Sequence, residues 1–338
     1  MKKTLIASAI AAATFSGSVL AMESAAELAA RMDSMPSVYG NIQYAIAHDA
    51  VDGGSSELSH FDNGSTIGFK HDHEIVPGLT GFLKIEFDGI NADDKSYGRG
   101  QIRLDEAYIG VKGDSFGQLW VGSDDSMYES TIDQIVNFYE VAALNIGGSY
   151  STGEGDLIQY KTPSFGGLTL GASLQINGDG DDQQPDDKSY PYQLAAMYSL
   201  GDLDLAVAMD SNDGNTGYSS TGLDINNENT YGVRAAYSLD NLTFSGEYQT
   251  RKDVGDLIGV QGVIALGANQ FALSYEMATA DDASDTEVTT ITAQALHNLS
   301  DNMYVYFEGY LGGGDDGVYG VAGKSERSVA SVGGVYYF

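Results

Sequence analysis

Apolar and polar residues alternate along most of this chain, in segments of roughly ten residues. In the segment 301–312, Phe307 and Leu311 fall on one face, whereas Tyr306 and Glu308 fall on the other. Successive side chains of a β-strand point to opposite faces, so each segment has one apolar face and one polar face. About ten residues is also the length that a tilted strand needs to cross a lipid bilayer. The alternation therefore predicts β-strands of membrane-spanning length.

Sixteen segments carry this pattern, and the connections between them differ in length. Those at 200–202, 239–241, 267–269 and 300–302 are only a few residues long, and they are interleaved with long connections rich in Asp, Asn and Gly. Short turns on one side and long loops on the other are typical of membrane barrels. A soluble β-sandwich or propeller is the alternative, but neither predicts this alternation of connection lengths.

We therefore predict an all-β fold, a transmembrane barrel of sixteen antiparallel strands. The expected strands lie near residues 37–47, 65–72, 79–90, 101–113, 117–124, 156–162, 167–177, 189–199, 202–211, 228–239, 241–251, 257–266, 269–279, 288–299, 301–312 and 327–338.

The first 21 residues have the features of a secretory signal peptide. A positive start precedes an apolar stretch at 5–13 and a small-x-small cleavage site at 19–21. No later window offers 18 apolar residues without charges, so we expect no membrane-spanning helix. Residues 22–36 form an N-terminal extension whose capping box predicts a short helix, with a frayed terminus as the equal alternative. The barrel domain is expected to occupy residues 37–338.

Acidic residues far outnumber basic ones. The chain has 48 Asp and Glu against 16 Lys and Arg, a formal net charge of −32. Such a chain repels nucleic-acid phosphate, so we expect no nucleic-acid partner. It also has no Cys, which excludes disulfides, thiolate metal sites and cysteine nucleophiles.

Several stretches of the sequence resemble the general porins of Gram-negative outer membranes. They are Ser65–Lys70, Ala107–Gly113, Phe116–Gly122, Ile158–Leu168 and the aromatic C-terminal residue Phe338. The resemblance implies a homotrimer of sixteen-stranded barrels in outer-membrane lipid and lipopolysaccharide, with the third long loop inside each pore. It also implies that Phe338 is the signal read by the barrel-assembly machinery.

The chain departs from that family's pattern in two places. The third long loop lacks the Pro-Glu-Phe-Gly-Gly stretch that many relatives carry, and the last strand has Val335 and Tyr337 where relatives often place Arg.

The long loop at 124–155 is the predicted pore constriction. A loop of this length is uncommon unless it is functional, and this one contains no Lys or Arg. A capping box at Ser126 and Glu129 predicts a short helix, which Ile132 and Tyr139 help to pack against the barrel wall. The alternative is an acidic loop solvated outside the barrel. The acidic residues assigned to the constriction are Asp124, Asp125, Glu129, Asp133, Glu140 and Glu154.

Strand parity predicts which charged side chains point into the barrel. The family resemblance implies a basic cluster opposite the acidic loop. The basic wall residues are Lys70, Lys84, Lys161, Arg234 and Arg251, and the acidic ones are Glu86, Asp88, Asp204, Asp210, Glu247, Glu276 and Glu308. Because acids predominate, we expect the lumen to attract cations and repel anions, an effect that salt screens.

These observations favour a general diffusion porin that passes small hydrophilic solutes and ions, performs no chemistry and needs no cofactor. A substrate-specific channel of the same fold is the first alternative, with Trp120, Tyr128, Tyr139 and Tyr150 forming a track for sugars. A barrel hydrolase using a rim histidine and a soluble secreted β-protein are further alternatives.

Two possible metal sites are weighed in the sequence. The segment 71–74 has the letters His-Asp-His-Glu but is expected in a short turn, so we predict no functional metal there. The loop aspartates either bind divalent ions that bridge to lipopolysaccharide or form the hydrated surface of a protein adapted to salt, and we favour the second reading.

Overall fold

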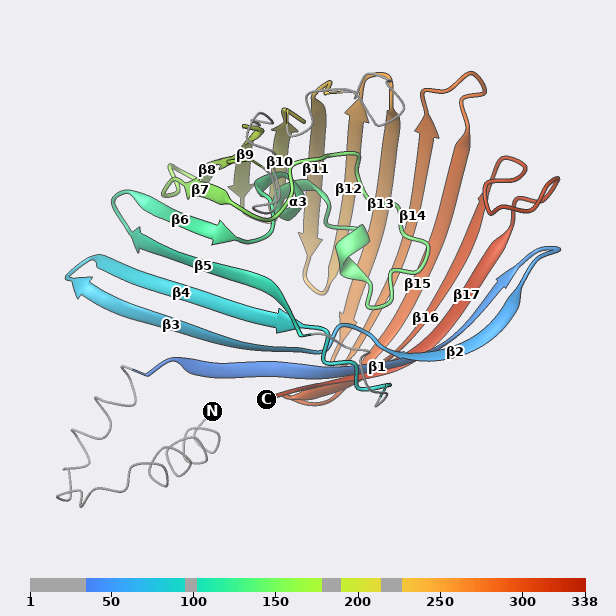
Figure 1. Ribbon diagram of the computed structural model, residues 1–338, viewed down its shortest axis with the longest axis horizontal. Coiled ribbons are helices and arrows are strands. Elements are labelled where there is room, and N and C mark those ends of the chain that lie inside the picture. The colour runs from blue at the N-terminus through green and yellow to red at the C-terminus, as the bar shows by residue number, and fades with distance from the viewer. Residues whose placement is uncertain (1–34, 95–101, 178–189, 214–226) are drawn as a thin grey trace, which may run out of the picture.

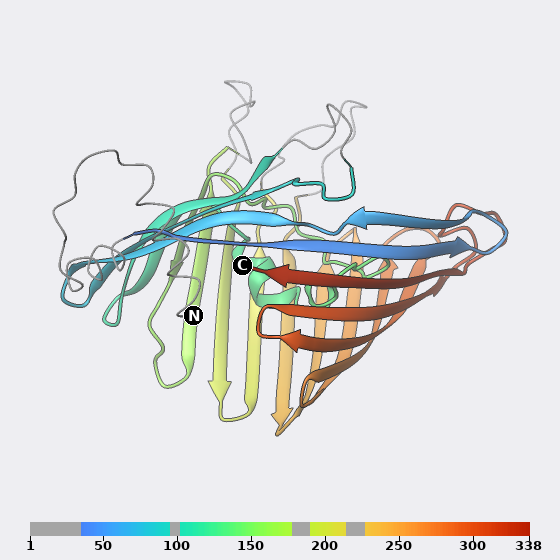
Figure 2. The same cartoon turned by 90° about the horizontal axis from the view of Figure 1, so that it is seen from below.

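A computed structural model describes residues 35–94, 102–177, 190–213 and 227–338 (Figure 1). The predicted signal peptide and nearly all of the 22–36 extension lie outside these residues. The described chain forms one antiparallel sheet in which nearly all strands pair with their neighbours in sequence. The last strand, β17 (Arg327–Tyr337), pairs with the first, β1 (Ser37–Val51), so the sheet closes into a barrel (Figure 2).

The seventeen strand segments make sixteen spanning strands, as predicted. Both β2 (Ser56–Asp62) and β3 (Thr66–Val76) pair with β1, one along each half of its length. They are therefore two parts of one strand, interrupted at residues 63–65. The interruption also changes the parity: odd-numbered residues of β2 point inward, whereas even-numbered residues of β3 do so.

The other strands lie within a few residues of their expected positions. They are β4 (Leu79–Asp88), β5 (Arg103–Gly113), β6 (Gly117–Ser123), β7 (Leu157–Lys161), β8 (Leu168–Gln175), β9 (Tyr192–Leu200), β10 (Leu203–Asp210), β11 (Thr230–Leu239), β12 (Leu242–Arg251), β13 (Gly255–Leu266), β14 (Asn269–Ala280), β15 (Glu287–Ser300) and β16 (Met303–Gly314).

Two expectations about connections were wrong. The connections at 52–55 and 252–254 lie on the long-loop side and are nevertheless short, so the alternation of lengths is not strict. The His-Asp-His-Glu segment at 71–74 lies inside β3 and not in a turn, with the rings of His71 and His73 stacked 6.3 Å apart.

The outer surface of the barrel is apolar. Phe244 is 52% exposed and Phe307 is 55% exposed, whereas Glu308, the neighbour of Phe307 in β16, is fully buried on the inner side. Apolar residues facing outward in a closed barrel face lipid. Among the described residues, no helix has the length and apolar character needed to cross a bilayer.

The connection between β6 and β7, here called L3 (residues 124–156), folds into the barrel as predicted. It contains the helix α3 (Met127–Ile132) and the 3₁₀ turn η1 (Val136–Phe138). Figure 1 shows α3 beside β9–β11, and the helix contacts strands β8–β11. Beyond η1 the loop runs on to β14–β16 before it returns to β7 (Figure 1).

Candidate functional site

Small residues of the barrel wall allow α3 to pack closely against it. Tyr128 and Ile132 are fully buried, and they pack with Trp120 and with alanines of β9 and β10. At Gly232 of β11, an added Cβ would lie 2.5 Å from the Tyr128 hydroxyl and 2.8 Å from Ile132. Ser126 caps the helix, its Oγ accepting from the Glu129 N–H at 3.3 Å. The Ser126 cap and the predicted packing face therefore hold α3 against the wall.

Carboxylates of the wall anchor the rest of L3. Asp210 accepts from the Thr152 N–H at 3.1 Å and from its hydroxyl at 2.6 Å. Glu276 accepts from Asn145 Nδ2 at 2.6 Å and from the Ile146 N–H at 3.3 Å. An irregular loop has few internal partners for its N–H groups, and buried N–H groups need acceptors.

Glu308 is the third anchor and holds the middle of L3. It accepts from the backbone N–H groups of Glu140 at 2.8 Å and Val141 at 3.0 Å. Gln294 Nε2 at 2.9 Å and the Tyr310 hydroxyl at 2.5 Å also donate to it.

These anchors add to the prediction for the acidic wall. Of the seven acidic side chains predicted to point into the barrel, Asp210, Glu276 and Glu308 are fully buried beneath L3. Glu247 is likewise covered, with 4% exposure. Parity correctly places them inside the barrel, and the loop then excludes water from them. Asp204 is exposed and accepts from Ser199 Oγ at 2.5 Å, close to the short turn between β9 and β10.

The six predicted L3 acids have different surroundings. Asp133 is buried and accepts from Gln249 Nε2 at 2.7 Å and from the Gly148 N–H. Glu140 accepts from the Tyr304 hydroxyl at 2.8 Å. Asp133 therefore serves the packing of the loop, and Glu140 joins it to β16.

The other acids of L3 remain accessible. Asp125 and Glu154 are exposed, and Glu129 and Asp124 are half-buried. Asp124 accepts from Trp120 Nε1 at 2.7 Å. Burial raises the pKa of Glu129 and of Asp124 above the usual carboxyl range, and the charge of Asp125 raises both further.

The predicted basic wall does not form a single cluster. Arg234 donates from Nε to the Thr131 carbonyl at 3.2 Å, at the end of α3. The amine of Lys161 lies 5.9 Å from the centre of the Trp120 ring, on β7. Of these five bases, only Lys70 on β3 and Lys84 on β4 are register partners on neighbouring strands.

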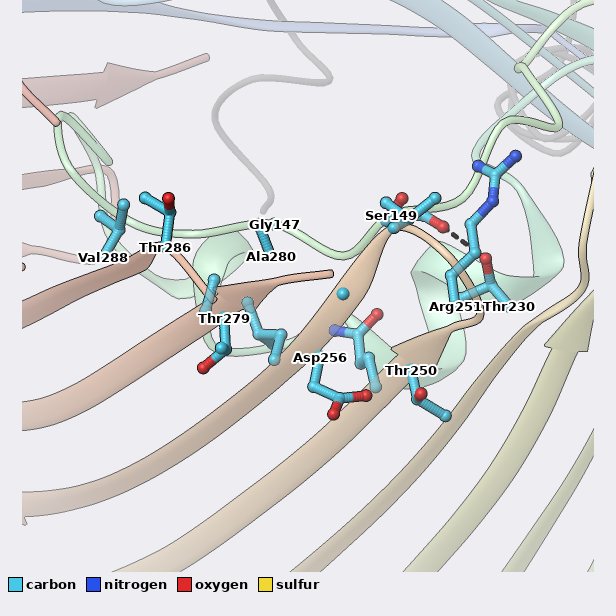
Figure 3. A pocket seen from close by; sticks show the side chains of 15 residues that line it. Gly147, Ser149, Thr230, Thr250, Arg251, Asp256, Thr279, Ala280, Thr286 and Val288 are labelled. Atoms are coloured by element: carbon cyan, nitrogen blue, oxygen red, sulfur yellow. Dashed lines mark hydrogen bonds between the residues drawn. The ribbon is translucent and has the colours of Figure 1, made fainter. Parts of the chain in front are cut away.

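Arg251 borders a pocket of about 220 Å³ between the return arm of L3 and β12–β15 (Figure 3). Thr230 closes one side by donating to the Ser149 carbonyl. The Arg251 guanidinium points away from the carboxylate of Asp256 (Figure 3).

Wall acids and bases also pair where β4 adjoins β5. Lys84 Nζ lies 2.5 Å from Glu106 Oε2 and 3.9 Å from Glu86 Oε2. Asp88 pairs with Arg103 at 2.6 Å. Glu106 was missed, although the alternation of Ala107 and its neighbours places it on the inward face.

The chain was compared with known proteins. A sequence profile described as Gram-negative porin matches residues 7–317. The chain belongs to the Gram-negative porins. This porin is therefore an outer-membrane protein that crosses the bilayer many times as a β-barrel.

Relatives of this porin include two from Halomonas. A protein named monosaccharide porin from Halomonas sp. and the major outer membrane protein of Halomonas elongata are each 30% identical over 91% of this chain and 94% of the relative. Solved structures with the same fold include an anion-selective porin from Comamonas acidovorans, with a TM-score of 0.69 and 17% identity over 90% of this chain and 99% of that one. OmpF of Salmonella typhi has a TM-score of 0.68 at 18% identity, over 90% of this chain and 98% of that one.

The aromatic track predicted for a sugar channel is not on the pore surface of this porin. Trp120, Tyr128 and Tyr139 are buried between L3 and the wall, and only Tyr150 is half-exposed. Their size suits them to fill the space beneath the loop, and that role competes with exposure to solutes.

Proposed function

We infer that this porin is a general diffusion channel that passes small hydrophilic solutes and ions, prefers cations and performs no chemistry. The observation that carries this proposal is the charge on the two sides of the passage. Asp125, Glu129 and Glu154 are accessible on L3, and Lys84 on the wall is paired with Glu106. An excess of acids along the passage attracts cations and repels anions where a channel is narrow.

The fold alone does not set the sign of selectivity, since the Comamonas acidovorans neighbour is an anion-selective porin. Selectivity depends on charges lining the passage. On the wall, Lys70 and Lys84 stand against Glu86 and Glu106 on β4 and β5, so these four charges cancel. The net negative charge of the passage therefore comes from the accessible acids of L3, which contains no Lys or Arg, and this supports a cation preference here.

Export by a signal peptide at 1–21, assembly as a homotrimer, and contact with lipid and lipopolysaccharide are further parts of the proposal. A solved neighbour, OmpT of Vibrio cholerae, is described in a trimer form and has a TM-score of 0.61. Phe338, the proposed assembly signal, exchanges backbone hydrogen bonds with Gly40 at 3.0 and 3.2 Å, and so lies at the seam where the barrel closes.

Recording from single channels in a planar bilayer under a KCl gradient tests the cation preference. The wild-type reversal potential is expected to show that K⁺ permeates better than Cl⁻. Replacing Asp124, Asp125 and Glu129 together by Asn, Asn and Gln is expected to reduce this preference. A preference that the triple replacement leaves unchanged would remove L3 from the selective part of the pore.

A sugar-specific channel is the second candidate. It is favoured by the 30% identity to the protein named monosaccharide porin. Saturable block of the ion current by one monosaccharide, with other sugars of equal size inactive, would support it. Sugar flux that depends only on molecular size would support general diffusion.

A further inference from the structure

The connection between β16 and β17, here called L8 (residues 315–326), is a compact loop. It folds back on itself through a hydrogen bond from the Gly317 N–H to the Lys324 carbonyl at 2.7 Å. Gly317 and Gly320 have φ values of +92° and +80°, a left-handed conformation that glycine adopts readily. The tight turns of L8 therefore have a basis in its sequence.

Ion pairs join the returning arm of L8 to the start of the barrel. Lys324 Nζ lies 2.7 Å from Asp52 Oδ2, and the Asp52 N–H donates to the Glu326 carbonyl at 3.0 Å. Arg327, which begins β17, pairs with Asp49 of β1 at 2.5 Å. Figure 2 shows L8 beside the tip of the hairpin that β1 and β2 form. These contacts fix the base of L8 at the rim of the barrel.

Tyr319 extends from L8 to the inner face of β16. At Gly312 an added Cβ would overlap with the Tyr319 hydroxyl. Gly312 is buried on the inner side of the strand, whereas its neighbour Leu311 is 61% exposed on the outer side. The Tyr319 hydroxyl also donates to the Gly313 carbonyl at 3.4 Å. The end of this side chain therefore lies inside the barrel.

The Tyr319 ring also packs against L3. The buried cluster that it covers consists of Ala47 of β1, Leu144 of L3, Tyr310 of β16 and Val329 of β17. Leu144 is only 9% exposed, whereas Tyr319 is half-buried. One side of the ring thus faces the cluster, and the other side remains accessible to water. L8 therefore occupies space inside the barrel next to the middle of L3.

We propose that L8 is a second determinant of the size limit of this porin and that it acts through the side chain of Tyr319. Discrimination by size depends on the diameter of the passage. L3 already narrows the barrel, and a ring held beside residues 141–144 takes further space from the same passage. A tyrosine suits this role because its large apolar ring packs on the cluster while its hydroxyl finds a polar partner. This inference deepens the proposed function: it rests on diffusion through this passage but not on the cation preference.

Single-channel recording with neutral polyethylene glycols of graded mass measures the size limit, because only polymers that enter the pore lower its conductance. Tyr319→Ala is expected to conduct more current than wild type and to admit larger polymers. Tyr319→Trp is expected to conduct less current and to exclude polymers that wild type admits. Equal limits in wild type and both variants would overturn the proposal. Shifts in the same direction for both variants would also overturn it, because they would report a loosened loop and not the volume of the side chain.

Two control variants separate the ring from the rest of L8. Val321 belongs to the same loop but packs on the β1–β2 connection, where an added Cβ at Gly54 would lie 3.0 Å from it. Val321→Ala and Tyr319→Phe are both expected to keep the wild-type size limit. A Val321→Ala channel with a limit as large as that of Tyr319→Ala would contradict the role of Tyr319.

Gly312→Ala provides a second test that leaves the sequence of L8 unchanged. The added Cβ would push the Tyr319 side chain away from the wall and into the passage. Conductance is therefore expected to fall when Gly312→Ala is made in wild type and to stay the same when it is made in Tyr319→Ala. An equal fall in both backgrounds would contradict the proposal.

The reversal potential and sugar block test the proposed function separately from this inference. None of the replacements changes a charge, so each variant is expected to keep the wild-type reversal potential in a KCl gradient. A wild-type channel without cation preference, or one blocked by a single monosaccharide, would refute the proposed function. The polymer size limits of the Tyr319 variants would still show whether L8 narrows the passage.

Discussion

Replacing Glu308 is expected to detach the middle of L3 from the wall. In Glu308→Ala, the backbone N–H groups of Glu140 and Val141 lose the carboxylate that accepts from them at 2.8 and 3.0 Å. Leaving a buried donor without a partner costs about 1–3 kcal/mol, so the two together amount to roughly 2–6 kcal/mol. Even the lower limit raises the population of the detached loop roughly 30-fold.

Two assays follow the detachment. Hydrogen exchange measures protection of the amides at 139–146, which is expected to fall in Glu308→Ala. Single-channel recording is expected to show added current noise, because a loop that moves in the passage changes its width. Glu326→Ala is the control, since Glu326 is exposed in the loop between β16 and β17. Equal protection and equal noise in Glu308→Ala, Glu326→Ala and wild type would refute the assignment of Glu308 as an anchor.

Two further predictions concern the packing of α3 against the barrel wall and the charge on L3. Gly232→Val places atoms against Tyr128 and Ile132. Overpacking of this kind costs about 1–3 kcal/mol, so the temperature of thermal unfolding should fall. An unchanged unfolding temperature would contradict the close approach of the helix to β11. Burial raises the pKa of Glu129 above its ordinary value of 4.5, so Glu129 gains its proton earlier as the pH falls. The cation preference, measured as a reversal potential, should therefore decline with a midpoint above pH 4.5. A midpoint at or below pH 4.5 would show that Glu129 does not contribute.

The strands were predictable from the sequence because one of their faces meets lipid and the other meets water. The alternation around Phe307 and Glu308 reports that difference directly. The segment β2 was missed because Ser56, Glu57 and Ser59 give it no apolar face, and nearly all of it is exposed. Its pairing comes from β1 and not from its own pattern.

The candidate site was only partly predictable. The place of L3 inside the barrel followed from its length and from the family resemblance, and the helix cap at Ser126 followed from local sequence. Parity also placed Asp210, Glu276 and Glu308 inside the barrel, but it does not report what covers an inward side chain. That depends on the path of L3, which is set by long-range contacts such as Tyr128 on Gly232. Asp105 is an extra residue where β4 pairs with β5, and such a bulge is a matter of strand register that leaves no local signature.

A single cysteine on L3 tests the central claim that this loop lies in the path of the ions. The natural chain has no Cys, so Glu129→Cys carries the sole thiol of the protein. A cationic thiol reagent added during single-channel recording is expected to reduce the current in steps and to shift the reversal potential towards Cl⁻, since each reaction places a positive charge where a carboxylate stood. Complete labelling of Cys at this position, verified by mass spectrometry, with no change in current or reversal potential would contradict the account.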